Sequence, residues 1–537
     1  MSKPIPQKTH ADIRAALLAR QEIALLDVRE EHPHAQAHPL FAANLPLSLI
    51  ELVAYTRLPR RSVSIVTLDD GEGYAEIAAQ RLRALGYTDV AVLAGGVSGW
   101  LAAGGELFRD VNVPSKAFGE LVEAKRHTPS LTAAEVQALI AAKADIVIVD
   151  ARRFDEYQTM SIPTATSVPG AELVLRIREL APRAETRVIV NCAGRTRSII
   201  GTQSLINAGI PNPVAALRNG TIGWKLAGQK LDRGQSRKFG QTTESNRQAA
   251  ADVARKVADR AGVKRVLPDG IHGWKAEDTR TTYFFDVRTP EEYVIGHLPG
   301  FNSAPGGQLV QETEMMAPVR GARIVLADSD GVRANMSASW LAQMGWDVFV
   351  VDGAISADFS EAGPAKQALP PLPVARKISP ATLNDWLRIP EETVVLDVAT
   401  SARYRQAHIP GAWFVLRSSL AKARLTKDWQ RVPKAKRYVL TCQSGILSLF
   451  AAAELEAMVS ANGAEVAVLE GGTQAWLTAG FPSESGLSRL ASEPIDRYRR
   501  PYEGTDNPRE AMQGYLDWEF GLVEQLARDG THHFQVL

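Results

Sequence analysis

The stretch from Asp145 to Arg153, DIVIVDARR, is a short apolar run followed by an aspartate, and it decides the fold because it recurs. Apolar runs that end in aspartate occur three more times: IALLD at 23–27, TYFFD at 282–286 and TVVLD at 393–397. Short runs of this kind, alternating with helical patterns, are typical of buried parallel strands joined by crossover helices. The sequence therefore predicts four copies of one small α/β unit.

A second apolar run follows each of these aspartates at a nearly constant distance. The aspartate that ends the first run and the residue that follows the second run are 42 positions apart in the first three copies and 45 in the fourth. These pairs are Asp27 and Asp69, Asp150 and Cys192, Asp286 and Asp328, and Asp397 and Cys442. Three copies then close on a glycine with tryptophan four residues later: Gly96 and Trp100, Gly220 and Trp224, Gly472 and Trp476. The third copy has Gly353 but lacks that tryptophan. Such a constant register indicates a true repeat.

The repeat and the polar or proline-rich stretches near residues 112, 240 and 370 predict the domain organisation. We expect units at 1–110, 118–235, 250–365 and 374–485, and a helical C-terminal extension at 486–537. In the extension Met512, Leu516, Phe520 and Val523 lie on one face of a helix, which predicts that it docks on the body. The fold class is α/β, with four small parallel-sheet cores flanked by helices and a helical tail.

Composition excludes several classes of protein. The 537 residues carry a formal charge of +1 and no long like-charged run, so neither a nucleic-acid nor a membrane partner is expected. Two cysteines 250 positions apart cannot form a disulfide framework, and the first residues lack the apolar core of a signal peptide. No apolar segment reaches the ~18 residues of a membrane span. We expect a cytoplasmic protein with small or local partners.

Cys192 stands in the loop NCAGRTRS, after the predicted strand RVIVN and before a helix expected from about Ser198. This places the sulfur at the carboxyl end of a parallel sheet, where open α/β folds bind ligands. Loop N–H groups and the helix start favour an anion there, so we expect a lowered thiol pKa and a nucleophilic thiolate. Arg195 and Arg197 are suited to hold an anionic substrate.

The cysteine and the aspartates at the strand ends also have structural interpretations. A free cysteine can be a small buried apolar residue, but the adjacent arginines and glycine argue against that at Cys192. The aspartates at the strand ends recur even in copies without cysteine, so a structural role is favoured for them, Asp150 included.

These residues resemble the rhodanese sulfurtransferase family. DVRTPEEYVIGHLPG at 286–300 is close to the opening motif of that family, and HIPGA at 408–412 is similar to its end. CAGRTRS at 192–198 looks like the active-site loop, and LAGGVSGW at 93–100 and LEGGTQAW at 469–476 look like the closing motif. The resemblance implies four tandem rhodanese-like domains. It also implies a reaction in which a loop cysteine takes sulfane sulfur from a donor such as thiosulfate, becomes a persulfide, and passes the sulfur to cyanide or another thiophile.

Carried over residue by residue, the resemblance makes Cys192 the sulfur carrier and Arg197 the loop arginine. It implies that the loop binds the anion through Ala193, Gly194, Arg195, Thr196 and Ser198, with Arg152 and Asp150 as nearby supports. No cofactor and no metal are implied; the partners are a small anionic sulfur donor and a thiophilic acceptor. The segment MSIPTATSVPG at 160–170 departs from the family because no Gly-His precedes Ile162, which weakens any role for a histidine in this copy.

The other three copies can be compared with the second at the same positions of the repeat. Asp69 and Asp328 stand at the cysteine position, so the first and third domains are expected to be inactive, although Arg333 corresponds to Arg197. The fourth copy keeps Cys442 but has Leu447 in place of the arginine. Its loop slightly resembles that of mercaptopyruvate-type sulfurtransferases, so Cys442 is either a second active site or a relic.

Two other classes remain as alternatives. Cysteine phosphatases use a similar loop with five residues between cysteine and arginine, whereas four residues separate Cys192 from Arg197 here, so phosphatase activity is not expected. A non-catalytic scaffold is conceivable because two of four units lack the nucleophile. The sequence identifies neither the physiological donor nor the acceptor, and aromatic residues in the tail leave a homodimer open.

Overall fold

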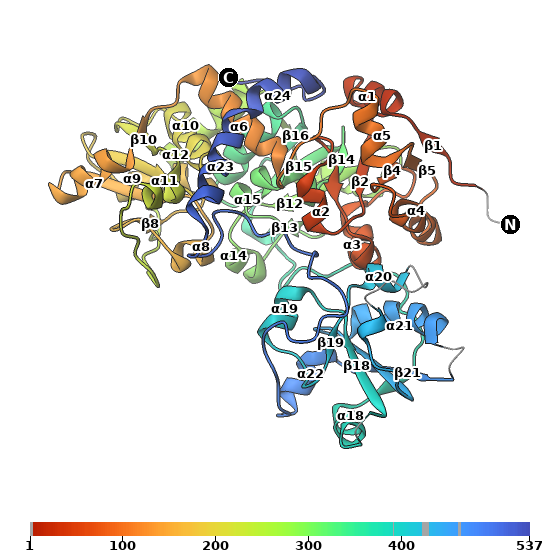
Figure 1. Cartoon of the computed structure of the whole chain (residues 1–537). Coiled ribbons are helices and arrows are strands. Elements are labelled where there is room, and N and C mark those ends of the chain that lie inside the picture. The colour runs from red at the N-terminus through yellow and green to blue at the C-terminus, as the bar shows by residue number, and fades with distance from the viewer. Residues whose placement is uncertain (1–3, 390, 422–428, 460–462) are drawn as a thin grey trace.

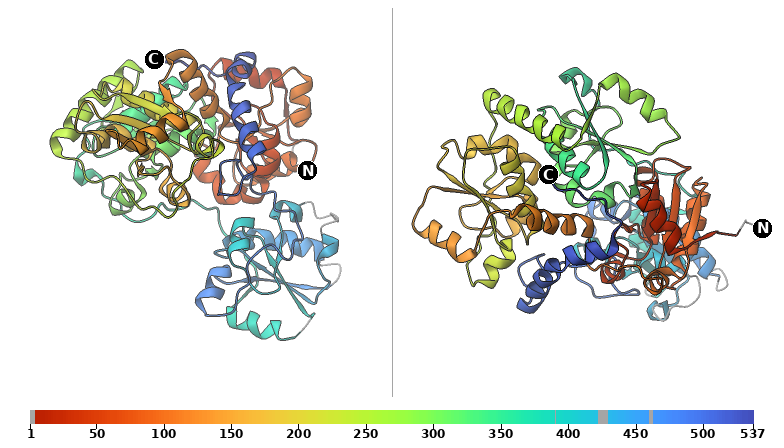
Figure 2. Two further views of the ribbon diagram at one scale, coloured as in Figure 1. Left: turned by 60° about the vertical axis from the view of Figure 1, so that its left-hand side comes forward. Right: turned by 90° about the horizontal axis from the view of Figure 1, so that it is seen from above.

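The computed structural model describes residues 4–389, 391–421, 429–459 and 463–537, and it contains four parallel α/β units with a helical C-terminal segment (Figure 1). The predicted fold class is confirmed. Each unit has its central strands in one order, so that the strand carrying the first aspartate lies beside the strand that leads to the loop. The three N-terminal units form one body, and the fourth is a separate lobe below it (Figures 1 and 2).

The first unit has strand order β1-β5-β4-β2, with β3 also paired to β2. Its elements are β1 (Gln7–Lys8), α1 (His10–Leu18), β2 (Ile23–Asp27), α2 (Glu31–Gln36), β3 (Ala43–Asn44), η1 (Leu47–Leu49), α3 (Ile50–Arg57), β4 (Ser64–Leu68), α4 (Tyr74–Ala84), β5 (Val90–Leu93) and α5 (Gly96–Ala102). A short strand of the third unit, β14 (Val319–Arg320), extends this sheet antiparallel to β2. The first and third units therefore share a sheet.

The second unit carries Cys192 and has strand order β6-β10-β9-β7-β8. Its elements are α6 (Val113–Arg126), β6 (Ser130–Leu131), α7 (Ala133–Ala141), β7 (Ile146–Asp150), α8 (Phe154–Thr159), β8 (Thr166–Ser167), η2 (Gly170–Glu172), α9 (Leu173–Leu180), β9 (Arg187–Asn191), α10 (Thr196–Asn207), β10 (Val214–Leu217) and α11 (Gly220–Leu226). All three central strands are buried along most of their length, as an apolar run covered on both faces requires.

The third unit has strand order β11-β16-β15-β12-β13. Its elements are α12 (Glu244–Arg260), β11 (Lys264–Val266), α13 (Pro268–Ala276), β12 (Thr282–Asp286), α14 (Pro290–Ile295), β13 (Asn302–Ser303), α15 (Gly306–Gln311), α16 (Thr313–Met316), β14, β15 (Arg323–Ala327), α17 (Arg333–Gln343), β16 (Asp347–Val351) and η3 (Ser356–Asp358). The expected unit starts at 118 and 250 fall inside α6 and α12, so these two helices precede their sheets.

The fourth unit has strand order β17-β21-β20-β18-β19. Its elements are β17 (Lys377–Ile378), α18 (Pro380–Leu387), β18 (Thr393–Asp397), α19 (Ser401–Gln406), β19 (Trp413–Phe414), α20 (Arg417–Ala421), η4 (Trp429–Arg431), β20 (Arg437–Thr441), α21 (Ile446–Val459), β21 (Glu465–Leu469) and α22 (Gly472–Thr478). Arg417, 2% exposed, pairs with Glu51 of the first unit and with Glu454 at 2.7 Å. This buried ion network joins the lobe to the body.

The C-terminal segment returns from the lobe to the body as α23 (Arg509–Phe520) and α24 (Leu522–Asp529), drawn in dark blue across α6 (Figure 1). Met512 and Leu516 are buried as predicted, but Phe520 is 54% exposed. The helix ends at Gly521, so Val523 belongs to α24 and not to the one continuous helix that was predicted. The segment packs against both α6 and α11, which brings it to the Cys192 loop.

Candidate active site

Cys192 lies in the short loop between β9 and α10, at the carboxyl end of the sheet of the second unit. β9 ends at Asn191 and α10 begins at Thr196, two residues before the predicted start at Ser198. Cys192 is 1% exposed. The sulfur is therefore placed where the fold binds ligands, but beneath the surface of the protein.

The closing motif of the repeat supports this loop through its backbone. The N–H and hydroxyl of Thr221 donate to the Cys192 carbonyl at 2.9 and 3.0 Å. Gly220 has φ of 53°, and a Cβ there would lie 2.4 Å from the same carbonyl oxygen, so only glycine fits. Gly96 and Gly472 come equally close to the matching carbonyls of the first and fourth units. This contact explains why the glycine recurs in register with the loop.

The Cys192 thiol is set among polar groups of the loop but is removed from water. Its Sγ lies 3.4 Å from the hydroxyl of Ser198, which in turn donates to the Arg195 carbonyl at 2.8 Å. The expectation of a lowered pKa is wrong for this state of the protein. Burial raises the pKa of the Cys192 thiol above its ordinary value, and the opposing effects of Arg197 and of the Ser198 hydroxyl and N–H are smaller.

Arg197 acts on the sulfur through its charge, but its side chain is bound by a carboxylate. Its two terminal nitrogens bind both oxygens of Glu156 on α8, at 2.7 and 2.9 Å. Burial would raise the pKa of Glu156, but the charge and hydrogen bonds of Arg197 outweigh it and hold that pKa at about 2. The pair fixes the position of the guanidinium, whose charge favours the Cys192 thiolate.

Arg195 points away from the sulfur. It forms a two-bond pair with Glu120 of α6 at 2.7 and 2.8 Å, also binds Glu123, and donates to the Asn219 side chain at 3.1 Å. The guanidinium lies 4.2 Å from the ring centre of Phe520. Arg195 is 4% exposed, so this arrangement ties the loop to α6 and to the C-terminal segment.

Asp150 and Arg152 form a buried pair behind the loop. Arg152 donates to the two carboxylate oxygens at 2.9 and 2.8 Å and to the Met160 carbonyl at 2.6 Å, and Asn191 donates to Asp150 at 2.9 Å. The same aspartate-arginine pair occurs in the first and third units, between Asp27 and Arg29 and between Asp286 and Arg288. The pair therefore connects the end of the first strand to the following helix in three units.

The C-terminal helix α23 covers the Cys192 loop. A Cβ at Gly194 would lie 3.1 Å from the ring of Tyr515 and 3.4 Å from Oε2 of Glu519. The hydroxyl of Thr196 lies 3.5 Å from Glu519 Oε1. Ala193 is 2% exposed beneath this cover. The tail thus completes the wall of the site, which its apolar pattern alone did not reveal.

A polar cavity of about 280 Å³ reaches this site from the side of Arg197. Its lining includes Glu156, Arg152 and Arg197 of the second unit and Arg500 and Tyr502 of the C-terminal segment. A small anion fits a space of this size and charge. The cavity therefore opens onto the pair of Arg197 and Glu156.

The loops of the first and third units are filled by their own aspartates. Asp328 Oδ1 accepts from the Gly331 N–H at 2.9 Å and Oδ2 from the Ala334 N–H at 2.7 Å. Asp69 accepts in the same way from the N–H groups of Tyr74 and Ala75, at 2.6 and 3.0 Å. In both units the carboxylate occupies the place that an anion would take.

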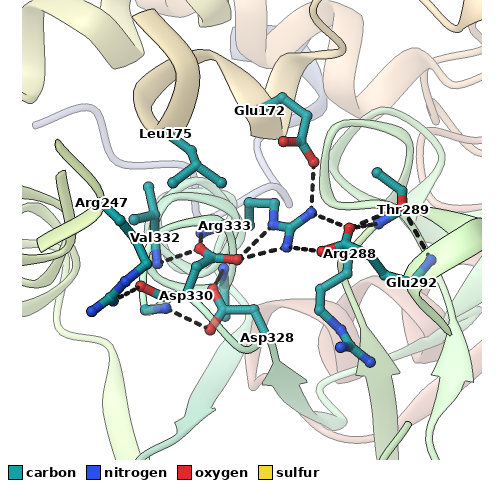
Figure 3. A network of polar contacts seen from close by, with 12 residues as sticks. Glu172, Leu175, Arg247, Arg288, Thr289, Glu292, Asp328, Asp330, Val332 and Arg333 are labelled. Carbon is teal, nitrogen blue, oxygen red and sulfur yellow. Dashed lines mark hydrogen bonds and ion pairs between the residues drawn. The ribbon is translucent and has the colours of Figure 1, made fainter. Parts of the chain in front are cut away.

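Arg333 of the third unit is the centre of a buried ion cluster rather than a free cation (Figure 3). It binds Asp330 at 2.7 Å, Glu292 at 2.6 Å, and Glu172 of the second unit at 2.7 Å. Arg333 is 1% exposed. Its pairing with Glu292 repeats that of Arg197 with Glu156, and the added glutamate joins two units.

Cys442 lies in the equivalent loop, between β20 and α21, but in different surroundings. It is 3% exposed and packs in an apolar cluster with Leu420, Leu447 and Leu449. Ala399 stands where the other units have the pairing arginine, and burial raises the pKa of Asp397 to about 7. The fourth unit therefore lacks the counterparts of both Arg152 and Arg197.

Two residues that matter here were not singled out in the sequence. Glu156 was detectable, since EY at 156–157 has the same spacing from its aspartate as EY at 292–293. Glu519 carried no local signal, because it lies over 320 positions from the loop that it covers.

The fold and the site together define a tandem α/β protein with a loop cysteine at the end of a parallel sheet. The family model described as rhodanese-like domain matches residues 10–103, 132–227, 274–360 and 379–479. The chain belongs to the rhodanese family.

Individual similar proteins cover the chain to very different extents. A thiosulfate sulfurtransferase of Pseudomonas aeruginosa of known crystal structure is 68% identical, with 99% of this chain and 100% of that one aligned at a TM-score of 0.96. A structure of an Anabaena protein is 26% identical over 20% of this chain and 86% of its own, with a TM-score of 0.19.

Among curated proteins, a helix-turn-helix-type transcriptional regulator of Mycobacterium tuberculosis is 31% identical over 90 residues, 17% of this chain. The chain spans 39% of the length of that curated relative. No helix in the described ranges is long and apolar enough to cross a bilayer.

Proposed function

We propose that this protein is a thiosulfate sulfurtransferase whose sulfur carrier is Cys192. The observation that carries the proposal is the second loop, where the cysteine after β9 is followed by an arginine that Glu156 holds in place and whose charge favours the thiolate. The 68% identical Pseudomonas thiosulfate sulfurtransferase, aligned over its whole length, supports the same reaction.

The reaction follows from the chemistry of a thiolate. The Cys192 thiolate attacks the sulfane sulfur of thiosulfate, the S–S bond to the sulfonate sulfur breaks, and sulfite leaves with the bonding electron pair. Cyanide or another thiophile then attacks the outer sulfur of the persulfide, and thiocyanate leaves as the thiolate is restored. Arg197 stabilises the anionic sulfur in both steps, and the backbone N–H of Ser198 donates to it.

Mass spectrometry of the protein after thiosulfate treatment tests this assignment. We expect a modification of one sulfur atom on Cys192, absent in Cys192→Ser, together with loss of thiosulfate:cyanide transfer in that variant. Retention of most activity in Cys192→Ser would overturn the assignment. No turnover of an aryl phosphate is expected.

The same spectra decide the alternative at Cys442. Its apolar surroundings and the missing arginine favour a relic over a mercaptopyruvate-type site. Cys442→Ser should therefore leave thiosulfate transfer unchanged, and mercaptopyruvate should not add sulfur to Cys442. A non-catalytic scaffold would show no modification at either cysteine.

We also infer a cytoplasmic location, because both cysteines are free, as a reducing compartment keeps them. A homodimer remains a prediction, which light scattering of the purified chain tests directly.

A further inference from the structure

Glu519 is a buried carboxyl that faces the Cys192 loop from the C-terminal helix. It is 0% exposed. Its Oε1 accepts a hydrogen bond from the Tyr515 hydroxyl at 2.8 Å, whereas Oε2 has no hydrogen-bond partner among the residues that the structure describes. Oε2 is also the carboxyl atom nearest Gly194. A buried oxygen without a partner is costly, so an atom held in this way is suited to a ligand.

The groups around Glu519 favour its neutral form. Burial raises its pKa to about 8; Glu120 of α6 adds to the rise, and Lys116, the Tyr515 hydrogen bond and Arg195 reduce it. Lys116, whose Nζ is paired with Asp110 at 2.8 Å, is the largest of the opposing effects, but burial outweighs it. The raised pKa favours the protonated carboxyl near neutral pH, and since Oε1 accepts from Tyr515, Oε2 is the oxygen free to donate.

The chemistry of the loop identifies the partner of that proton. The loop N–H groups and the start of α10 favour an anion at this position. A neutral carboxyl can donate to such an anion, whereas a carboxylate would repel it. Glu519 is therefore suited to a donor that carries oxyanion oxygens, as the sulfonate group of thiosulfate does.

We propose that Glu519 is a donor-binding and specificity-determining residue of the Cys192 site, and that Oε2 donates a hydrogen bond to a sulfonate oxygen of the sulfur donor. This assignment rests on the proposed function of Cys192. It makes the C-terminal segment part of the active site rather than a packing element.

Binding of thiosulfate to the Cys192→Ser protein isolates this contact, because no sulfur is transferred and the thiol no longer titrates. Calorimetric titration between pH 6.5 and 9.5 should show a dissociation constant that rises above pH 8 as Glu519 ionises. In the Cys192→Ser, Glu519→Gln double variant the dissociation constant should stay constant with pH, since an amide remains a neutral donor. Cys192→Ser, Glu519→Ala should bind about tenfold more weakly at pH 7, the loss expected for one hydrogen bond to an anion.

Glu510→Gln is the matched control, because Glu510 is exposed on the same helix. Added to Cys192→Ser, it should leave both the affinity and its pH dependence unchanged. An equal alkaline loss of affinity with and without Glu519→Gln would overturn the inference, as would unchanged binding in the alanine variant.

Persulfide formation separates this inference from the proposed function. If the unaltered protein gains a sulfur on Cys192 while the Glu519 variants bind thiosulfate normally, the donor-binding role of Glu519 alone is wrong. If the unaltered protein gains no sulfur and Cys192→Ser binds no thiosulfate at any pH, both are overturned.

Discussion

Substitution of Glu156 by glutamine should weaken the second unit and at the same time change the reactivity of Cys192. The carboxylate binds Arg197 through two hydrogen bonds, and both side chains are largely buried. Glutamine keeps the shape but removes the charge, so Arg197 stays buried without a counterion. Loss of one partner of a buried pair is much more costly than loss of an exposed one.

The size of the effect follows from the pKa of Glu156, about 2 against an ordinary 4.5. That gap of roughly 2.5 pH units corresponds to about 3.5 kcal/mol, at 1.4 kcal/mol per unit. Glu156 is 23% exposed, so we expect a loss of roughly 2–3 kcal/mol at pH 7. Because the folded-state pKa is lowered, this stability is present above pH 4.5 and is lost as the pH falls toward 2.

Urea denaturation, with hydrogen exchange of peptides from α8 and α10, measures this loss in the full chain. In a Cys442→Ser background, the rate of iodoacetamide alkylation against pH reports the pKa of Cys192. That pKa should fall in Glu156→Gln, since Arg197 keeps its charge while the neutralising carboxylate is gone. Glu185→Gln, at an exposed position of the same unit, should change neither quantity. A loss below about 1 kcal/mol, the range of exposed pairs, or an unshifted alkylation profile would refute the reasoning.

Three further substitutions test other parts of the structure. Arg195→Ala should lower the free energy of unfolding by about 3–5 kcal/mol, because Glu120 is left buried and unpaired, while the KM for thiosulfate in the folded enzyme changes little. Arg417→Ala should increase hydrogen exchange at the contact between Glu51 and the fourth unit without changing activity. Asp328→Asn should gain stability relative to the unaltered protein as the pH rises from about 4 to 7. Burial raises the pKa of Asp328 to about 7, so the aspartate protein loses stability in that window and the asparagine variant does not. Equal pH profiles of the two proteins in urea titrations would contradict this.

The sequence predicted the repeat and the position of the sulfur because both depend on local patterns. The apolar run before Asn191 became β9 over the predicted residues, and the glycine of the closing motif lies against the loop because no side chain fits there. Such features are set by strand burial and by backbone approach, which each copy encodes within its own residues.

The partners of the arginines could not be predicted in this way. Arg195 pairs with Glu120, 75 positions earlier, on a helix that lies before its sheet. The cover over Gly194 comes from Glu519, beyond two further units. A charged residue in a loop reveals that a partner is needed, but not which distant element brings it, because that depends on how the units pack.

The aspartates at the cysteine position explain how two units keep the loop fold without chemistry. A thiol is a weak acceptor, so the N–H groups around Cys192 gain most from an anion that enters the loop. A carboxylate in the same place accepts from those groups itself, as Asp69 and Asp328 do. The exchange of cysteine for aspartate thus fills the loop with an internal hydrogen-bond acceptor in the place of an external anion. The second unit keeps the thiol. The carboxyl that faces its loop is Glu519 of the C-terminal helix, and the protonation of Glu519 can vary with the ligand.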